Sequence, residues 1–339
     1  MTTRIVVDDL SQVGSARRAA DVVARECRLD ETRRGMVGIV ATEAATNLAR
    51  HARQGALLAQ GTAHSGVAGV EIVAVDAGPG LHDVDRAFAD GFSTGGTPGT
   101  GLGAIRRQAD ELDLYTAPGQ GTIVLARVFA KPPERGVSRD ALVDVGAVCL
   151  PIDGETVCGD GWAVVQHADR ATILLVDGLG HGASAAEAAD VAIDAFRAVV
   201  TRTPREIVAA LHDALRVTRG AALAVADVTR TPDGIAVRHC GVGNTVAAIV
   251  GDGSPRALPS MNGTAGLQVR TLREFSQPWA TGVLLMHTDG ITTRWRADAY
   301  PGIVGHDPTI LAAALQRDHS RGRDDATVLV FRLRTGARP

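Results

Sequence analysis

The chain has 339 residues, a length that exceeds one small hydrophobic core and suits two domains. Its net charge of −3 and its 3% of aromatic residues argue against nucleic-acid binding and base stacking. The four cysteines form no C-x-x-C pair, so we expect reduced thiols, a cytoplasmic location and no structural zinc. No signal-peptide pattern and no apolar run of transmembrane length is present, so we expect no membrane partner.

The first third of the chain predicts a compact α/β arrangement. A short strand is expected at residues 4–7, a helix over 13–27 and a longer helix from about 31 to 52. Residues 55–69 are small and polar and predict a loop, which leads to a strand at 70–75.

The helix at 31–52 places Glu43, Asn47 and His51 at successive i, i+4 positions, and therefore on one face. An amide oxygen can bind magnesium while a carboxylate one turn away accepts a proton. For this helix taken alone, three polar residues on a solvated face are the simpler interpretation.

Two glycine-rich segments follow. The strand at 70–75 ends in Asp76-Ala77-Gly78-Pro79-Gly80, and residues 91–103 (G-F-S-T-G-G-T-P-G-T-G-L-G) lead into an expected helix at 104–112. Backbone N–H groups of such a loop, together with a helix N-terminus, can bind phosphates, although flexible linkers have similar composition. A strand at 123–129 completes this part.

The order of these three motifs is more specific than any one of them. Residues 5–129 resemble the ATP-binding GHKL fold, an α/β sandwich, and most closely the serine kinases of bacterial sigma-factor control. These are anti-sigma factors and stressosome switch kinases. The resemblance implies ATP with Mg²⁺ as cofactor and in-line phosphoryl transfer. It implies Glu43 as general base, Asn47 as magnesium ligand, Asp76, Gly78 and Gly80 at the adenine, and a phosphate loop containing Gly101, Leu102 and Gly103.

Residues 130–140 are charged, contain two consecutive prolines and predict a linker. We place the boundary so that residues 1–134 form one domain and residues 135–339 the other.

The second domain begins with an expected strand at 142–151. Another strand over residues 171–177 ends in V-D-G-L-G-H-G and precedes a helix at 184–200. Thr203 is the expected cap of a helix with Pro204 at its first position. The remaining expected elements are strands at 221–228, 235–239, 283–286 and 328–333, and a helix at 308–316.

Four aspartates, Asp160, Asp177, Asp289 and Asp324, each occur where a strand meets a turn. A single Asp-Gly is most simply a turn, but the ordered set favours a metal centre. Oxygen ligands without Cys or His select Mg²⁺ or Mn²⁺. Converging carboxylates would repel one another, and two metal ions would offset this repulsion, lower the pKa of a water molecule and hold a phosphoryl group.

Residues 140–333 resemble the SpoIIE-like branch of the PPM (protein phosphatase 2C) serine/threonine phosphatases, which form an α-β-β-α sandwich. The matching segments are C-G-D-G-W, V-D-G-L-G-H-G, H-T-D-G-I and R-D-D-A-T-V-L-V. The resemblance implies a catalytic Asp177 that bridges two metal ions, one held also by Asp160 and the carbonyl of Gly178, the other by Asp289 and Asp324. Asp325 is expected to assist these ligands indirectly, and His181 to shape its turn rather than to act as an acid.

The two resemblances together predict a two-domain α+β enzyme, a metal-dependent protein serine/threonine phosphatase fused to a switch-kinase-like domain. The expected partner is a STAS-domain anti-anti-sigma or stressosome protein, with a sigma factor or another regulator as a further candidate. As an alternative, the N-terminal domain is a non-catalytic, nucleotide-dependent module that binds a partner and regulates the phosphatase. A wholly non-catalytic scaffold fits the complete acidic set poorly.

Overall fold

The computed structural model describes residues 2–81, 83, 101–133, 141–251 and 254–334. The chain divides into two compact units: residues 1–136 with 300–306, and residues 137–299 with 307–339. Both are α+β, as predicted. None of the helices in the described ranges is long and apolar enough to span a membrane.

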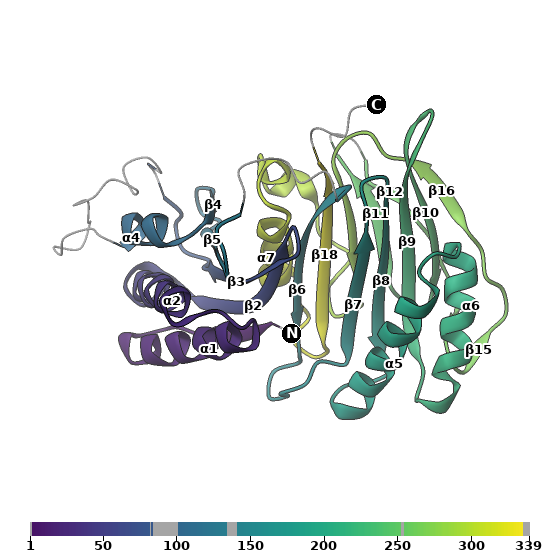
Figure 1. Cartoon of the computed structure of the whole chain (residues 1–339), viewed down its shortest axis with the longest axis horizontal. Coiled ribbons are helices and arrows are strands. Elements are labelled where there is room, and N and C mark those ends of the chain that lie inside the picture. The colour runs from purple at the N-terminus through teal and green to yellow at the C-terminus, as the bar shows by residue number, and fades with distance from the viewer. Residues whose placement is uncertain (1, 82, 84–100, 134–140, 252–253, 335–339) are drawn as a thin grey trace. The chain divides into compact units, whose positions relative to one another are not determined.

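The N-terminal unit is a five-stranded antiparallel sheet with helices packed on one face (Figure 1). The hydrophobic core lies between that face and the helices, and it includes Val37, Ala41, Leu57 and Ile72. The strands, in spatial order, are β1 (Thr3–Val6), β2 (Ala56–His64), β3 (Val67–Val75), β5 (Thr122–Phe129) and β4 (Glu111–Thr116). The helices are α1 (Val13–Glu26), α2 (Glu31–His51) and α4 (Gly101–Gln108).

Two expectations for this unit were wrong. The expected loop at 55–69 is β2 and the start of β3, which pair as a hairpin along their whole length. Its turn is made by Ser65 and Gly66, both at positive φ. The expected helix at 104–112 ends at Gln108, because the next residues pair with β5 as strand β4. In both cases pairing with the neighbouring strands of the sheet overrides the local composition.

The C-terminal unit consists of two stacked sheets (Figure 1). The first contains β13 (Ser260–Met261), β10 (Gly234–Val242), β9 (Ala221–Thr231), β8 (Arg170–Gly178) and β7 (Asp160–Gln166), with β16 (Phe275–Pro278) also paired to β10. The second contains β12 (Arg256–Ala257), β11 (Val246–Val250), β17 (Val283–His287), β18 (Ala326–Leu333) and β6 (Val143–Leu150). A small separate pair is formed by β14 (Gly263–Thr264) and β15 (Gln268–Val269).

Helices cover both outer faces of this sandwich. The first sheet packs against α5 (Ala183–Val199) and α6 (Pro204–Ala214), and α7 (Pro308–His319) packs against β6 and β18 of the second. The unit has one hydrophobic core between the two sheets and another between the first sheet and its helices. Alternate residues of β8 pack into these two cores: Ile173 faces the other sheet and Leu174 faces the helices. The result is the predicted α-β-β-α layering.

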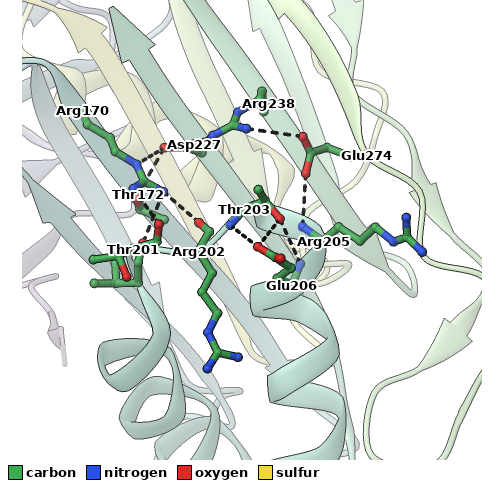
Figure 2. A network of polar contacts seen from close by, with 11 residues as sticks. Arg170, Thr172, Thr201, Arg202, Thr203, Arg205, Glu206, Asp227, Arg238 and Glu274 are labelled. Carbon is green, nitrogen blue, oxygen red and sulfur yellow. Dashed lines mark hydrogen bonds and ion pairs between the residues drawn. The ribbon is translucent and has the colours of Figure 1, made fainter.

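A buried carboxylate joins β8, β9 and β10 to the end of α5 (Figure 2). Asp227 is fully buried and forms ion pairs with Arg170, at 2.8 Å, and with Arg238. Arg170 also donates to the carbonyls of Thr201 and Arg202 beyond the helix end, at 3.0 and 2.8 Å. These contacts compensate the buried charge and tie helix to sheet.

The start of α6 lies beside this network (Figure 2). Thr203 is its cap and forms a reciprocal capping box with Glu206, and Pro204 occupies the first helical turn, as predicted.

His239 on β10 predicts an acid sensitivity of the C-terminal unit. Its ring is fully buried, and neither ring nitrogen has a well-formed hydrogen bond among the described residues. Burial lowers its pKa to about 4. Between that value and about 6.5, the unfolded chain binds a proton that the native state rejects, so stability falls as pH falls through this window.

We therefore expect the native chain to lose about 2 kcal/mol more unfolding free energy than His239→Leu between pH 6.5 and 4.5. All three tryptophans, Trp162, Trp279 and Trp295, lie in this unit, so urea unfolding followed by tryptophan fluorescence measures the difference. The exposed His167→Leu change is the control. Identical pH profiles for the native chain and His239→Leu would contradict the prediction.

Candidate functional site

The four predicted aspartates lie at strand ends contributed by both sheets of the C-terminal unit. Asp160 begins β7 and stands directly opposite Asp177 near the end of β8. Asp289 follows β17 and Asp324 precedes β18, and these two strands are antiparallel neighbours. Residues far apart in the sequence are thereby brought to one end of the sandwich.

The carboxylates perturb one another, which shows that they share one electrostatic environment. Burial, followed by the charges of Asp289 and Asp324, raises the pKa of Asp177 to about 7. Burial and the charge of Asp177 raise the pKa of Asp160 well above its usual value. Burial and Asp324 also raise the pKa of Asp289. A site of this kind stabilises bound cations.

Hydrogen bonds from residues that the motifs did not single out orient two of the ligands. Thr288 is fully buried, and its Oγ1 donates to Asp160 Oδ2 at 2.8 Å. Thr288 Oγ1 also accepts a hydrogen bond from the N–H of Thr327 at 3.0 Å. Asn244 Nδ2 donates to Asp289 Oδ2 at 2.6 Å. Thr288 lies in the H-T-D-G-I segment, but only the stacking of the two sheets reveals its partner Asp160. Asn244 precedes β11, and the pairing of β11 with β17 brings it to Asp289.

Asp325 supports the backbone that carries Asp160. Its carboxylate accepts from the N–H groups of Ile152 and Gly159, at 2.8 and 2.6 Å, and it is buried. This agrees with its expected indirect role. His181 is paired with Glu155 at 3.1 Å at the exposed turn after β8.

Close backbone approaches explain the glycines of the motifs. A Cβ at Gly178 would lie 2.3 Å from the carbonyl oxygen of Ala185, and one at Gly290 would lie 1.9 Å from that of Asp325. Side chains at these positions would push apart the strand ends that carry the aspartates.

The residues fit a divalent metal centre in their chemistry. In the described part of the chain, no three His, Cys, Asp or Glu side chains are grouped so that they could hold a metal ion as they stand. The fit comes from the donors themselves: they are all hard carboxylates, Asp160 is buried, and hydrogen bonds orient Asp160 and Asp289. Asp177 and Asp160 from one sheet and Asp289 and Asp324 from the other are the residues that would hold the ions.

Removing the Thr288 hydroxyl should weaken this centre. In Thr288→Val, which preserves shape, Asp160 and the N–H of Thr327 lose a buried partner. We expect a loss of about 1–3 kcal/mol in unfolding free energy and a roughly 10–100-fold higher Mn²⁺ concentration for half-maximal stabilisation. Thermal melts at increasing Mn²⁺ measure both. Thr231→Val, which removes a hairpin hydroxyl bond to Gly234, is the control, and equal Mn²⁺ dependence in the two variants would refute the expected role.

In the N-terminal unit, Asn47 and Gly101 come together although 54 residues separate them in sequence (101 − 47). A Cβ on Gly101 would lie 2.7 Å from Asn47 Oδ1, so the start of α4 lies directly over the amide. Glu43 lies one turn earlier on the same face of α2 and is partly buried. Leu102 packs against the core, and Gly103 is buried.

Asp76 is held in a tight turn after β3. Its Oδ1 accepts the N–H of Gly78 at 2.6 Å, and its own N–H donates to Thr122 at 3.0 Å. A Cβ on Gly80, which has φ +80°, would lie 2.5 Å from the carbonyl oxygen of Ala117. A Cβ on Gly78 would approach the carbonyl of His51 to 3.7 Å, which places this turn beside the end of α2.

Residues 84–100, which include most of the predicted glycine loop, lie outside the described residues. The described part therefore contains helix α2, the Asp76 turn and the Gly101 backbone. This set is compatible with a bound nucleotide, with backbone close to Asn47 and no side chain on Gly78 or Gly101 to fill the space.

Comparisons with known proteins agree with the resemblances found for the N-terminal and the C-terminal parts of the chain. Residues 6–128 match the family model of the histidine kinase-like ATPase domain. The serine/threonine-protein kinase RsbT of Bacillus subtilis (strain 168) is 33% identical over 112 residues, which are 33% of this chain and 84% of RsbT.

Two solved structures extend the likeness to more than half of the chain. One belongs to work on the bacterial stressosome as a modular system adapted to control secondary messenger signaling. It has a TM-score of 0.52 and 27% identity and covers 56% of this chain and 99% of its own. The other, RsbX in complex with magnesium, has a TM-score of 0.51 and 18% identity and covers 57% of this chain and 96% of its own.

These findings confirm the two resemblances. The N-terminal part of the chain belongs to the RsbT-like histidine kinase-like ATPases, and the rest of the chain has a PPM-like fold.

Proposed function

We propose that this chain is a bifunctional cytoplasmic switch that sets the phosphorylation of a STAS-domain anti-anti-sigma or stressosome protein. The PPM domain (residues 135–339) removes phosphate from a serine or threonine, and the kinase-like domain (1–134) adds it. The observation that carries the proposal is the convergence of four aspartates at one end of the sandwich, where burial and neighbouring carboxylates raise the pKa values of Asp160, Asp177 and Asp289.

In the phosphatase domain, Asp177, Asp160 and the carbonyl of Gly178 would hold one metal ion. Asp289 and Asp324 would hold the second. When bound, Mg²⁺ or Mn²⁺ supplies the positive charge that transfer of a phosphoryl group to water requires. Thr288 keeps Asp160 oriented through its 2.8 Å hydrogen bond, and Asp160 is itself buried.

In the kinase-like domain, Asn47 binds the magnesium of ATP, and Glu43 accepts the proton of the acceptor hydroxyl. Asp76, Gly78 and Gly80 form the adenine site, and the backbone of Gly101, Leu102 and Gly103 faces the phosphates. The close approach of the Gly101 backbone to the Asn47 amide supports this arrangement.

The substrate assignment rests on the relatives. RsbT is named as a serine/threonine-protein kinase, and one similar structure comes from the bacterial stressosome. A kinase domain of that family joined to a phosphatase fold is consistent with opposing actions on one partner of the same class.

The test is a two-way assay with the full chain and a purified STAS-domain protein. We expect phosphate release from the phosphorylated protein only with Mn²⁺ or Mg²⁺, and transfer of label from [γ-³²P]ATP to the unphosphorylated protein. Absence of metal-dependent hydrolysis of both the phosphoprotein and p-nitrophenyl phosphate would overturn the phosphatase assignment. A sigma factor or another regulator as the bound partner would appear in pull-downs without label transfer.

A further inference from the structure

Beside the acidic centre lies a cavity of about 410 Å³ lined by Thr292, Thr293, Arg294, Arg321 and Arg323. Its two segments are continuous with the proposed metal ligands: Arg323 precedes Asp324, and Thr292 follows Asp289 by three residues. The Arg-rich lining contrasts with the net charge of −3 of the whole chain. The cavity is therefore a local cationic feature at the edge of an anionic site.

Backbone hydrogen bonds hold the two segments side by side. The N–H of Arg321 donates to Gly290 at 2.8 Å, the N–H of Thr292 donates to His319 at 2.9 Å, and Ile291 and Ser320 form a β-bridge. The backbone of the three arginines is therefore held in place by contacts between the two segments.

A buried hydrogen bond attaches the Arg294 segment to β17. Trp295 Nε1 donates to His287 Nε2 at 3.0 Å, and His287 Nδ1 lies 2.8 Å from the carbonyl oxygen of Thr288. Because Nε2 accepts, the ring proton lies on Nδ1 and donates to that carbonyl. His287 is fully buried, so this link fixes Arg294 relative to the strand end that carries Asp289.

The guanidinium N–H groups at the cavity are available to bind an anion. None of Arg294, Arg321 and Arg323 makes a side-chain hydrogen bond or ion pair with another described residue, and no carboxylate lines the cavity. By contrast, Arg170 and Arg238 in the same unit are paired with Asp227. Arg323 directly precedes Asp324, and the N–H of Arg321 donates to the carbonyl of Gly290, the residue after Asp289, so both arginines start beside the acidic centre.

We propose that this cavity is an oxyanion subsite of the phosphatase, in which Arg294, Arg321 and Arg323 bind an anionic group of the phosphoprotein substrate. The proposal rests on the phosphatase function proposed above. Guanidinium groups match carboxylate and phosphate oxygens in two-point hydrogen bonds. The bound group is the phosphoryl group itself or a carboxylate next to the phosphorylated residue, and the two sources have the same chemistry here.

The substrate would be guided by this subsite as well as by the metal centre. Carboxylates at the centre repel an incoming phosphomonoester, and a positive rim attracts it, an effect that weakens with salt. The subsite would therefore favour phosphoproteins with acidic residues near the phosphosite over neutral ones.

The test measures binding and turnover with the same ligands. Two phosphoserine peptides, one with Asp and Glu flanks and one with Asn and Gln at the same positions, are titrated into full-length Asp177→Asn by calorimetry. Arg294→Ala, Arg321→Ala and Arg323→Ala are then added singly, with Arg→Lys at each position and Arg197→Ala on an exposed turn of α5 as control.

We expect each alanine variant to weaken binding of the acidic peptide by about three- to tenfold, and the lysine variants to retain part of it. An effect confined to the acidic peptide assigns a flanking carboxylate. An equal effect on both peptides, with a matching rise in KM for p-nitrophenyl phosphate in chains that carry Asp177, assigns the phosphoryl group.

Binding that is the same in the arginine variants and in Arg197→Ala overturns the subsite, even if the wild-type chain is an active phosphatase. Conversely, a wild-type chain without metal-dependent hydrolysis overturns the proposed function. The calorimetric readout then still reports whether the arginines bind the anion, so the two failures are distinguishable. Melting temperatures within about 2 °C of the parent variant show that each fold is intact.

Discussion

Asp177→Asn is expected to lower metal-dependent phosphatase turnover by at least about 10³-fold, which corresponds to about 4 kcal/mol of lost transition-state stabilisation. The change removes one negative charge from the position that faces Asp160 across β7 and β8 and interacts with Asp289 and Asp324. Phosphate release from p-nitrophenyl phosphate and from the phosphorylated partner, at saturating Mn²⁺, measures the loss.

The same substitution should make the metal-free chain more stable, which separates inactivity from misfolding. Asp177 carries a pKa of about 7 because burial and like charges oppose its ionisation. Removing that charge relieves repulsion, so Asp177→Asn should melt several degrees above the native chain in EDTA at pH 8. Mn²⁺ should raise the melting temperature of the native chain and have little effect on the variant.

Asp190→Asn on the exposed side of α5 is the matched control, and it should alter neither activity nor metal response. Retention of more than a tenth of the turnover by Asp177→Asn would exclude a central metal-ligating role for this residue.

Glu43→Ala is expected to abolish phosphoryl transfer to the STAS partner, by about 10²–10⁴-fold, while ATP binding changes little. Glu43 lies one helical turn from Asn47, so it can reach an acceptor hydroxyl without contacting the adenine turn at Asp76. Label transfer from [γ-³²P]ATP is best measured in the Asp177→Asn background, because the phosphatase domain then cannot remove the product.

Glu31→Ala in the first turn of α2 provides the control on the same helix. The non-catalytic alternative for this domain makes the opposite prediction: Glu43→Ala would leave partner binding and phosphatase regulation intact, and the native chain would transfer no label. Asn47→Ala extends the comparison, since this change should weaken Mg²⁺-dependent ATP binding itself. Because the Asn47 side chain lies against Gly101, the change should also loosen the packing of the start of α4.

The candidate site residues could be proposed from the sequence because each lies in a short motif whose residue types and spacing are recognisable without the fold. Asp-Gly pairs at strand ends, the Glu43–Asn47 spacing and the glycine-rich loop each depend on a few neighbouring residues, and their order along the chain made them specific. The glycines of these motifs are now explained by backbone contacts as close as 1.9 Å for a Cβ at Gly290. The motifs therefore encode packing as well as chemistry.

The supporting residues required the tertiary structure. Nothing in the sequence distinguishes Thr288 from other threonines. Its role is visible only because the end of β17 in one sheet meets the start of β7 in the other. The same holds for Asn244, whose partner Asp289 is 45 residues away. The three arginines at the cavity come from two segments joined by backbone hydrogen bonds, and no local pattern distinguishes them from solvated surface charges.

The sequence by itself located the aspartates and the N-terminal nucleotide motifs, because turn chemistry depends on neighbouring residues. The family resemblances that these motifs carry implied the two fold types. The tertiary structure decided that residues 55–69 form β2, a turn and the start of β3, that β4 follows α4, and which side chains orient the ligands. Strand pairing and hydrogen bonds between distant segments depend on contacts that no short window of sequence contains.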